Sequence, residues 1–445
     1  THCISSAASD VYKRQVFVHE FGHFIVAKWA NVYVEKFSIG FGPVLLRKKY
    51  GETEYVLSAL PLGGYVKMYG EQNDDEPGLE NYDTTKEGRS FKDKSGWHKA
   101  AIVFAGPLFN VIFAILIFWG LYMTGIPSYS AVIGTVEYGS VAENAGLKAG
   151  DRIVAVDNEK IRSWNEFVSI IADKPNEKVT ITLSDNRQIN LTIGEKEVAD
   201  IFGDKEKIGS IGASLQIDAV IGEVMPNMAA AEAGLLKGDK ILSINGEEIL
   251  SWNDSADLIR SKPGQELMVI VERQGKELPF KLTPKPTEQG SGENKKTVGL
   301  IGIAPIDGDI NVRYGPVDAM VMGLEKSYEL TKIIYLGFAK LVQREIPADS
   351  LGGPILIVET AAQSAESGFS ALLIFMAAIS INLAVFNLLP IPVLDGGQLA
   401  IIGAEGIMGR PLGEKALGAF QMFGLLVIIS LMVFAFYNDI MRLIK

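Results

Sequence analysis

The chain has 445 residues, and its 42 Lys and Arg against 53 Asp and Glu give a net charge of −11, which argues against a bulk nucleic-acid binder. With 48% hydrophobic and 21% charged residues, it is not a disordered chain. One cysteine and four histidines, at positions 2, 19, 23 and 98, exclude an intramolecular disulfide and a cysteine-rich zinc site. Any bound metal must therefore be held by a few histidines together with carboxylates.

The N-terminal region divides into two parts. Residues 1–15 are polar and match no helical pattern, and we interpret them as sequencing-adapter read-through that replaces the true start of a first span. The next stretch, Val16 to Ala27, is apolar apart from two histidines and one glutamate, but it is too short to cross a bilayer alone. We expect a truncated first transmembrane helix over residues 16–30.

This apolar stretch contains an H-E-x-x-H motif, formed by His19, Glu20 and His23. On a helix, positions i and i+4 share a face, so both imidazoles can reach one metal ion. Glu20 is placed to take a proton from a water molecule that zinc activates. A merely structural role is disfavoured, because uncompensated His and Glu side chains are costly among apolar residues. We therefore predict zinc as the cofactor.

Three later stretches lack Lys, Arg, Asp and Glu: residues 100–136, 367–394 and 416–438. A bilayer span needs about 20 mostly apolar residues, since about 30 Å of hydrocarbon is crossed at about 1.5 Å per residue. The alternative, buried helices of a large soluble protein, is weakened by three runs of this length. We expect spans at 100–125, 369–391 and 416–438. Residues 31–99 then form a cytoplasmic or membrane-associated β-hairpin region, with His98 as an interfacial residue.

The insert after the second span contains a duplication with a constant offset of 88 residues. The segment Val132–Val136 recurs as Val220–Val224, and Ser163-Trp164-Asn165 recurs as Ser251-Trp252-Asn253. A fixed offset indicates two copies of one domain-sized unit. We expect the copies at 126–205 and 206–286. The glycine- and proline-rich residues 284–297 are predicted to be a linker.

Each copy resembles a PDZ domain of the bacterial membrane-protease type, through its A-G-L-x-x-G-D core and the preceding strand. PDZ domains capture an extended peptide as an added strand. The resemblance implies that four residues lie near the peptide grooves: Ile133, Gly134, Ile221 and Gly222. The alternative is that the repeated glycines and tryptophans only shape turns and fill cores.

Two segments remain between the insert and the last span. Residues 287–368 are expected to be a linker followed by a helix, in which 319–341 is apolar with scattered charges. This helix is either interfacial and amphipathic or packed on soluble protein. Pro390 and Pro392 must distort the helix at the end of the span at 369–391. Residues 392–415 are therefore predicted to be a loop.

An acid in this loop supplies the missing metal ligand. A catalytic zinc needs a third protein ligand and an open position. Irregular backbone at membrane depth is tolerated only where protein or a wet cavity satisfies it, so Asp395 is a functional candidate. Asn387 has two interpretations: its amide donates to a peptide carbonyl or a developing oxyanion, or it makes an interhelical hydrogen bond.

Together these motifs resemble the site-2 protease family of intramembrane zinc metalloproteases, in particular its bacterial branch with tandem PDZ domains. The matching stretches begin at Val16 and cover nearly the whole remaining chain. They are HEFGH, Gly40–Pro43, Pro61–Met68, Ala105–Asn110, Gly352–Ile355 and Asn387–Gly397. One departure is Gln398, where a histidine is expected, but this position is not a presumed ligand.

The resemblance implies a set of roles for individual residues. Zinc would be bound by His19, His23 and Asp395, with Glu20 as the general base and Asn387 contacting the substrate. Within the β-region, a strand-like substrate would be held near the active site. There, Tyr65 and Met68 either line the substrate groove or simply anchor the hairpin in the interface.

The resemblance also implies a fold and a location. The fold is a polytopic α-helical membrane protein with about four transmembrane helices, a membrane-associated β-element and two extracytoplasmic PDZ domains of α+β type. It would lie in the bacterial inner membrane, with periplasmic PDZ domains and an active site near the cytoplasmic side. Basic residues after the first span and between the last two agree with this orientation.

The implied activity is regulated intramembrane proteolysis. Its substrates would be single-span membrane proteins of the anti-sigma-factor type and remnant signal peptides, and its other partner is the lipid bilayer, with no nucleic acid. The PDZ pair would exclude substrates that retain bulky ectodomains.

Three rival functions remain open. A membrane-tethered scaffold with a relic metal site conflicts with the intact set of candidate ligands. A metal transporter predicts more acids and histidines across several spans. A PDZ-bearing serine protease lacks a serine motif in this sequence.

Overall fold

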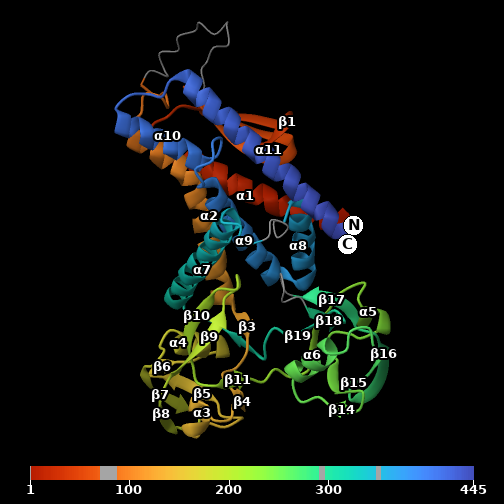
Figure 1. Cartoon of the computed structure of the whole chain (residues 1–445). Helices are drawn as coiled ribbons and strands as arrows, with labels where there is room; N and C mark the ends of the chain where they lie inside the picture. Colours follow the sequence, from red (N-terminus) through yellow and green to blue (C-terminus); the bar gives the residue numbers. More distant parts are fainter. Residues whose placement is uncertain (1, 71–87, 290–295, 347–351, 445) are drawn as a thin grey trace. The chain divides into compact units, whose positions relative to one another are not determined.

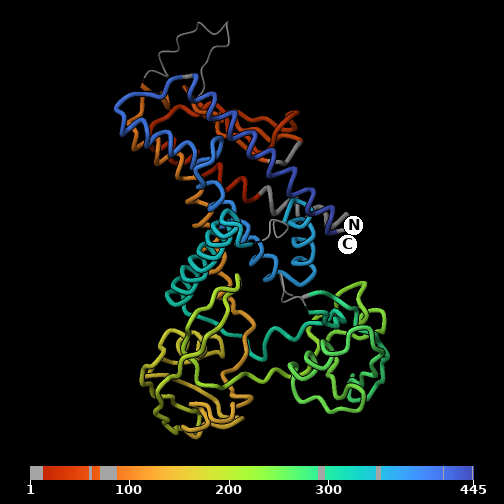
Figure 2. The backbone as a smooth tube through the Cα atoms, in the orientation of Figure 1, coloured from red at the N-terminus to blue at the C-terminus, as the bar shows by residue number. Residues whose placement is uncertain are grey.

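The computed structural model describes residues 2–70, 88–289, 296–346 and 352–444 (Figure 1). The chain divides into two compact units, Thr1–Thr124 with Arg313–Lys445, and Gly125–Val312. Along the tube in Figure 2, the second unit is inserted between the orange α2 and the teal α7. We describe each unit separately.

The first unit is mainly helical. Its helices are α1 (His2–Trp29), α2 (Gly96–Thr124), α7 (Pro316–Val342), α8 (Pro354–Ser367), α9 (Phe369–Asn387), α10 (Asp395–Met408) and α11 (Glu414–Ile444). Within the described residues, α2, α9 and α11 are long and apolar enough to cross a membrane. They coincide with the three charge-free stretches that predict spans.

Two predictions for this unit were wrong. Residues 2–15, for which no helical pattern was expected, are helical, since α1 begins at His2 and continues without a break into the H-E-x-x-H motif. Their interpretation as adapter read-through stays a prediction. The predicted loop 392–415 contains α10, which begins at Asp395 itself. The helix predicted at 319–341 is present as α7, which packs against α2 and α9.

Close backbone contact joins α1 to α2. A Cβ atom at Gly22 of α1 would overlap the carbonyl group of Ala105 in α2. Phe21 and Phe109 pack beside this contact, with ring centroids 6.1 Å apart. The absence of a side chain at Gly22 therefore sets how closely the motif helix approaches α2.

The predicted β-region consists of two long antiparallel strands, β1 (Val34–Tyr50) and β2 (Thr53–Met68), that fold back on each other. Ser38 pairs with both Val56 and Tyr65, so residues 34–39 lie between two segments of β2. Residues 44–50 form an outer edge, and no strand pairs with its far side among the described residues.

An ion cluster ties this sheet to the end of α1. Glu52, at the turn between the strands, accepts two hydrogen bonds from Arg89 at 2.7 and 2.8 Å and is paired with Lys28 of α1. The Arg89 guanidinium, aided by Lys28, lowers the pKa of Glu52 from 4.5 to about 2.

The second unit contains the duplicated repeats. The first comprises β4 (Ile133–Val136), α3 (Val141–Asn144), β5 (Ile153–Val156), β6 (Glu159–Lys160), α4 (Trp164–Ala172), β7 (Lys178–Leu183), β8 (Gln188–Thr192), β9 (Gly194–Ala199), β10 (Lys205–Ser210) and β11 (Ala213–Leu215). The second comprises β12 (Ile221–Val224), α5 (Ala229–Ala233), β13 (Lys240–Ile244), β14 (Glu247–Glu248), α6 (Trp252–Arg260), β15 (Leu267–Arg273), β16 (Lys276–Leu282), β17 (Lys285–Gln289), β18 (Lys296–Leu300) and β19 (Ile303–Pro305).

The repeats share their topology and their helix caps. Their sheets have the equivalent orders β6-β5-β7-β8 and β14-β13-β15-β16. Each long helix begins after a serine, Ser163 or Ser251, whose hydroxyl accepts a hydrogen bond from the backbone three residues on. The 88-residue duplication is thus a duplication of structure.

The predicted repeat boundaries at 205/206 and 286 were too early. In the first repeat, β11 pairs with β4, and Ile211 belongs to the same hydrophobic core as Ile133. In the second, β19 pairs with β12. The predicted linker 284–297 largely forms the β17–β18 hairpin, apart from 290–295, which lie outside the described residues.

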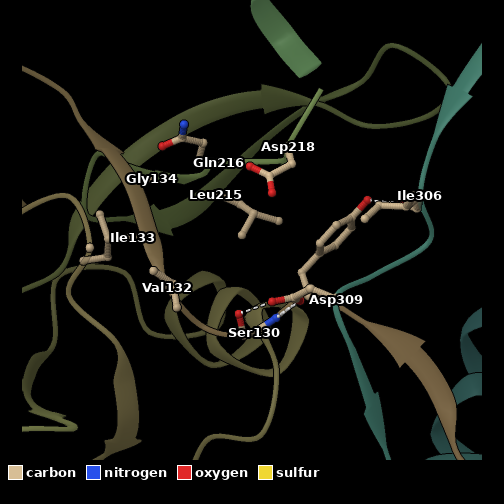
Figure 3. Close-up of a pocket in the computed structure, with 11 residues that line it drawn as sticks. Ser130, Val132, Ile133, Gly134, Leu215, Gln216, Asp218, Ile306 and Asp309 are labelled. Carbon is tan, nitrogen blue, oxygen red and sulfur yellow. Dashed lines mark hydrogen bonds between the residues drawn. The ribbon is translucent and has the colours of Figure 1, made fainter. Parts of the chain in front are cut away.

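A short ribbon joins the entrance and exit of the second unit, where β3 (Ile126–Ser128) pairs with β20 (Ile310–Val312). Asp309 accepts hydrogen bonds from the Ser130 amide at 2.7 Å and hydroxyl at 2.6 Å, and the Tyr129 hydroxyl donates to the Ile306 carbonyl (Figure 3). Beside these contacts lies a cavity of about 360 Å³ that Leu215 also lines. The two ends of the repeat pair are therefore held together.

We predict that the Glu52 cluster stabilises the fold in a pH-dependent way. Because the pKa of Glu52 is lowered from 4.5 to about 2 on folding, its contribution is fully present above about pH 4.5 and is lost as the pH falls through about 2. Thermal unfolding of the detergent-solubilised chain should show Glu52→Gln to be less stable than wild type at pH 7. This difference should shrink as the pH falls; a difference that persists at pH 2 would contradict the assignment.

Candidate metal centre

Three potential ligand atoms from two helices converge inside the first unit. His19 and His23 lie one turn apart on α1, with their Nε2 atoms 3.2 Å from each other. Asp395, the first residue of α10, places Oδ2 3.3 Å from His19 Nε2 and Oδ1 3.6 Å from His23 Nε2. One ligand atom from each residue lies within 4.8 Å of the others. The structure therefore brings the predicted triad together.

The chemistry of this cluster fits a divalent cation. The three side chains are 12–14% exposed, and Asp395 Oδ2 is buried without a hydrogen-bond partner among the described residues. Buried oxygen and nitrogen acceptors that face one another need a cation to satisfy them. Two imidazole nitrogens and one carboxylate form a three-ligand set that suits catalytic zinc and leaves a position for substrate or water.

Tight backbone packing brings Asp395 to this point. Cβ atoms at Gly396 and Gly397 would overlap backbone carbonyl groups of Leu389 and Ile391, so the proline-containing loop folds directly onto the start of α10. In the same loop, Val393 has a φ of 82°, a left-handed conformation that is strained for a β-branched residue. The loop is thus held in one unusual shape beside the ligand.

Helix α2 supports both histidines from behind. His23 Nδ1 lies 2.8 Å from the carbonyl oxygen of Ile102, so its proton is directed to Nδ1 and Nε2 is left for a metal. A Cβ atom at Gly106 would overlap the His23 ring and lie 2.7 Å from His19 Cε1. The imidazoles therefore occupy space that any other residue at position 106 would fill.

The two predicted catalytic residues also reach the centre. Glu20 is half-buried next to His19, and a Cβ at Gly64 of β2 would lie 2.9 Å from its Cγ, so the sheet packs against the motif. Asn387, at the end of α9, has its amide nitrogen 3.3 Å from His19 Nε2. Their catalytic roles stay predictions. His98 is exposed and bonds to Ser95, outside this cluster.

The two residues of the sheet that were predicted to contact substrate, Met68 and Tyr65, differ in their burial. Met68 is 6% exposed and belongs to a core with Phe24 and Phe37, so its proposed place in a groove was wrong and it anchors the sheet. Tyr65 is half-buried and stacks on Phe41, with ring centroids 6.0 Å apart. Its contact with substrate stays a prediction.

Of the predicted peptide-groove residues of the repeats, Ile133 and Gly134 line the cavity of about 360 Å³ (Figure 3), and a contact of any of the four with peptide stays a prediction. Ile133 and Ile221 are 1% and 0% exposed in the two repeat cores. Their strands, β4 and β12, are bonded on both sides, by β11 or β19 and by the segments ending at Asp151 and Asp239. Cβ atoms at Gly134 and Gly222 would overlap the crossing chain. In the β4–β11 and β12–β19 pairs, the outer sides of β11 and β19 have no paired strand among the described residues.

The contacts of Ile102, Gly106 and Asn110 with the histidine rings were not predicted. Gly106 and Asn110 lie in a quoted motif, but no role was assigned to them. Glycine and asparagine four residues apart within an apolar span share a helix face, and this spacing was the sequence signal that could have identified them.

Comparison with known proteins agrees with this geometry. The model of peptidase family M50 matches residues 14–431. The chain belongs to peptidase family M50. It is therefore a zinc metalloprotease, and the resemblance to the site-2 protease family is confirmed.

Full-length relatives support the assignment. The M50 peptidase described here is 36% identical over 445 residues to the regulator of sigma-E protease RseP of Escherichia coli, covering 96% of each chain. It is 35% identical over 443 residues to a putative zinc metalloprotease of Vibrio cholerae, again covering 96% of each chain. It is an inner-membrane protein by this relationship.

One solved structure matches a smaller part. The PDZ domain of an SdrC-like protein from Listeria monocytogenes is 25% identical, covers 21% of this chain and 94% of that chain, and has a TM-score of 0.17.

We predict that Gly106→Ala weakens zinc binding by at least about tenfold, because the added methyl group displaces the histidine rings. Gly120→Ala, on the same helix with no atom within 4 Å of the added Cβ, is the matched control and should bind zinc like wild type. Competition with a chromogenic chelator measures both affinities. Equal affinities for the two variants would mean that the close packing at Gly106 does not matter to the centre.

Proposed function

We propose that this M50 peptidase hydrolyses peptide bonds within or beside the transmembrane segment of single-span membrane proteins. Substrates of the anti-sigma-factor type and remnant signal peptides fit this role. The observation that carries the proposal is the convergence of His19, His23 and Asp395 among apolar helices, two of which are long enough to span a membrane. The name of the Escherichia coli relative, a regulator of sigma-E protease, supports the substrate class.

The side chains divide the chemistry between them. When bound by His19, His23 and Asp395, zinc supplies Lewis-acid chemistry that makes water a nucleophile near neutral pH. Glu20 takes a proton from the attacking water as its oxygen bonds to the peptide carbon, and gives a proton to the leaving nitrogen as the C–N bond breaks. Asn387 donates its amide N–H to the substrate carbonyl oxygen as negative charge develops there.

The sheet supplies a way to present an unwound substrate. A transmembrane helix satisfies its own backbone hydrogen bonds, so the scissile bond is accessible only after local unwinding. The edge at residues 64–68, opposite the edge at residues 44–50, has no paired strand among the described residues, so its backbone groups can bond an added strand. The same sheet contacts Glu20 through Gly64, which links strand capture to the catalytic base.

The depth of the centre supports an active site in the cytoplasmic half of the membrane. Gly106 follows the start of α2 at Gly96 by ten residues, which corresponds to about 15 Å of helix. We infer a cytoplasmic start of α2, because Lys28 and Arg47–Lys49 precede it and Arg410 and Lys415 lie between the last two spans. With α1 as the first span, this topology has four spans and places residues 125–312 in the periplasm.

The repeat pair is proposed as a filter that excludes substrates with bulky ectodomains. Because its entrance and exit strands pair, with Ser128 opposite Ile310, the whole unit follows one short ribbon. This geometry lets the unit be positioned or removed as a single body.

Replacing Glu20 with Gln tests the chemical mechanism. The variant should bind zinc with wild-type affinity yet lose at least about 100-fold in cleavage of a membrane-embedded model substrate, because the proton acceptor is gone. Zinc content and cleavage in proteoliposomes are the two measurements. Undiminished cleavage would refute the role of Glu20, whereas a scaffold or transporter would show no cleavage even in the wild-type chain.

Removing the repeats tests the filter. Replacing residues 129–309 with Asn-Gly closes the β3–β20 ribbon with a two-residue turn. This variant should cleave an untrimmed substrate that the full chain refuses, and both should cleave the trimmed substrate equally. If the shortened chain cleaves only the trimmed substrate, the repeats do not act as the filter.

A further inference from the structure

Asn110 is a fully buried polar residue beside the metal centre. It lies in α2 with 0% of its surface exposed, and its side-chain oxygen has no hydrogen-bond partner among the described residues. Its amide nitrogen lies 3.4 Å from His19 Nδ1. A buried polar atom without a partner is energetically costly, so its retention within an apolar helix needs a reason.

The position of Asn110 is set by a neighbouring helix. Its backbone carbonyl accepts a hydrogen bond from the Ser380 hydroxyl of α9 at 2.9 Å, and both residues are 0% exposed. This contact leaves the Asn110 side chain free to serve another partner. Its amide nitrogen faces the outer nitrogen of the His19 ring.

When a histidine binds a metal through Nε2, its Nδ1 atom requires a hydrogen-bond acceptor. His19 directs Nε2 toward His23 and Asp395, so Nδ1 must carry the proton of the neutral ring and requires an acceptor. Rotating the Asn110 amide by 180° exchanges its oxygen and nitrogen, which places the oxygen against Nδ1. The orphaned oxygen then becomes the acceptor.

We propose that Asn110 is a positioning residue for zinc binding, whose amide oxygen accepts the Nδ1–H of His19. His23 has the equivalent arrangement, with its Nδ1 bonded to the Ile102 carbonyl. Residues 102, 106 and 110 are spaced by four and share one face of α2. This face holds one histidine at each end, and Gly106 between them leaves room for both rings.

A competing acceptor makes the proposal testable. The Gly106 carbonyl also lies within hydrogen-bonding reach of the His19 ring. If that carbonyl alone orients His19, Asn110 only fills space, and a similarly sized apolar residue would serve. Asn110→Leu removes the amide at similar volume, whereas Asn110→Asp keeps an oxygen at the same position.

The test is zinc affinity of the full chain in detergent, measured by chelator competition. Asn110→Leu should weaken zinc binding about 10- to 100-fold, whereas Asn110→Asp should stay within about threefold of wild type. Gly120→Ala, on the same helix with no atom within 4 Å of the added Cβ, is the control and should also stay within about threefold. Substrate plays no part in this measurement.

Thermal unfolding separates positioning from folding. Without zinc, Asn110→Leu should unfold within a few degrees of wild type. A zinc concentration that saturates the wild-type chain should raise the Tm of Asn110→Leu by less than it raises the Tm of wild type. Wild-type zinc affinity in Asn110→Leu would overturn the proposal and assign the acceptor to Gly106. Equal losses in the Leu and Asp variants would overturn it too, because an acceptor oxygen would then not be what matters. If Asn110→Leu does not fold, Asn110→Ala takes its place as the variant without an acceptor oxygen, and wild-type zinc affinity in Asn110→Ala would overturn the proposal.

Discussion

The close approach of α1 and α2 is the constraint on which the metal centre depends. Gly22 allows the two backbones to meet, and Gly106 leaves space for both imidazole rings. Polar groups among apolar helices are expensive unless each has a partner, so the ligands must be supported on every side. The Ile102 carbonyl bonds His23 from behind, and Asp395 reaches both rings from α10.

The same packing connects catalysis with substrate capture. The β1–β2 sheet contacts Glu20 through Gly64 and is tied to the end of α1 by the Glu52 cluster. A sheet beside the catalytic base can hold an unwound segment in extended form, which a helical bundle cannot do with its own backbone. The proposed hydrolysis inside a membrane therefore uses both a supported metal and an available strand edge.

The candidate metal ligands were predictable from local patterns, whereas the contacts that support them were not. H-E-x-x-H specifies a shared helix face within five residues, and an acid after two prolines in an apolar region is unusual enough to identify Asp395. The repeats were found through a constant offset. Their boundaries were misjudged, because the last strand of each repeat pairs with its first, a long-range contact that periodicity does not reveal.

By itself, the sequence determined the apolar spans, the duplication and the identities of His19, Glu20, His23 and Asp395, since each follows from spacing or composition over a short window. Only the tertiary structure decided that Met68 anchors the sheet, that Ile133 and Ile221 fill cores, and that Gly106 and Asn110 face the histidines. The physical reason is that burial and hydrogen-bond partners depend on which helices and strands meet, and residues far apart in the chain determine that.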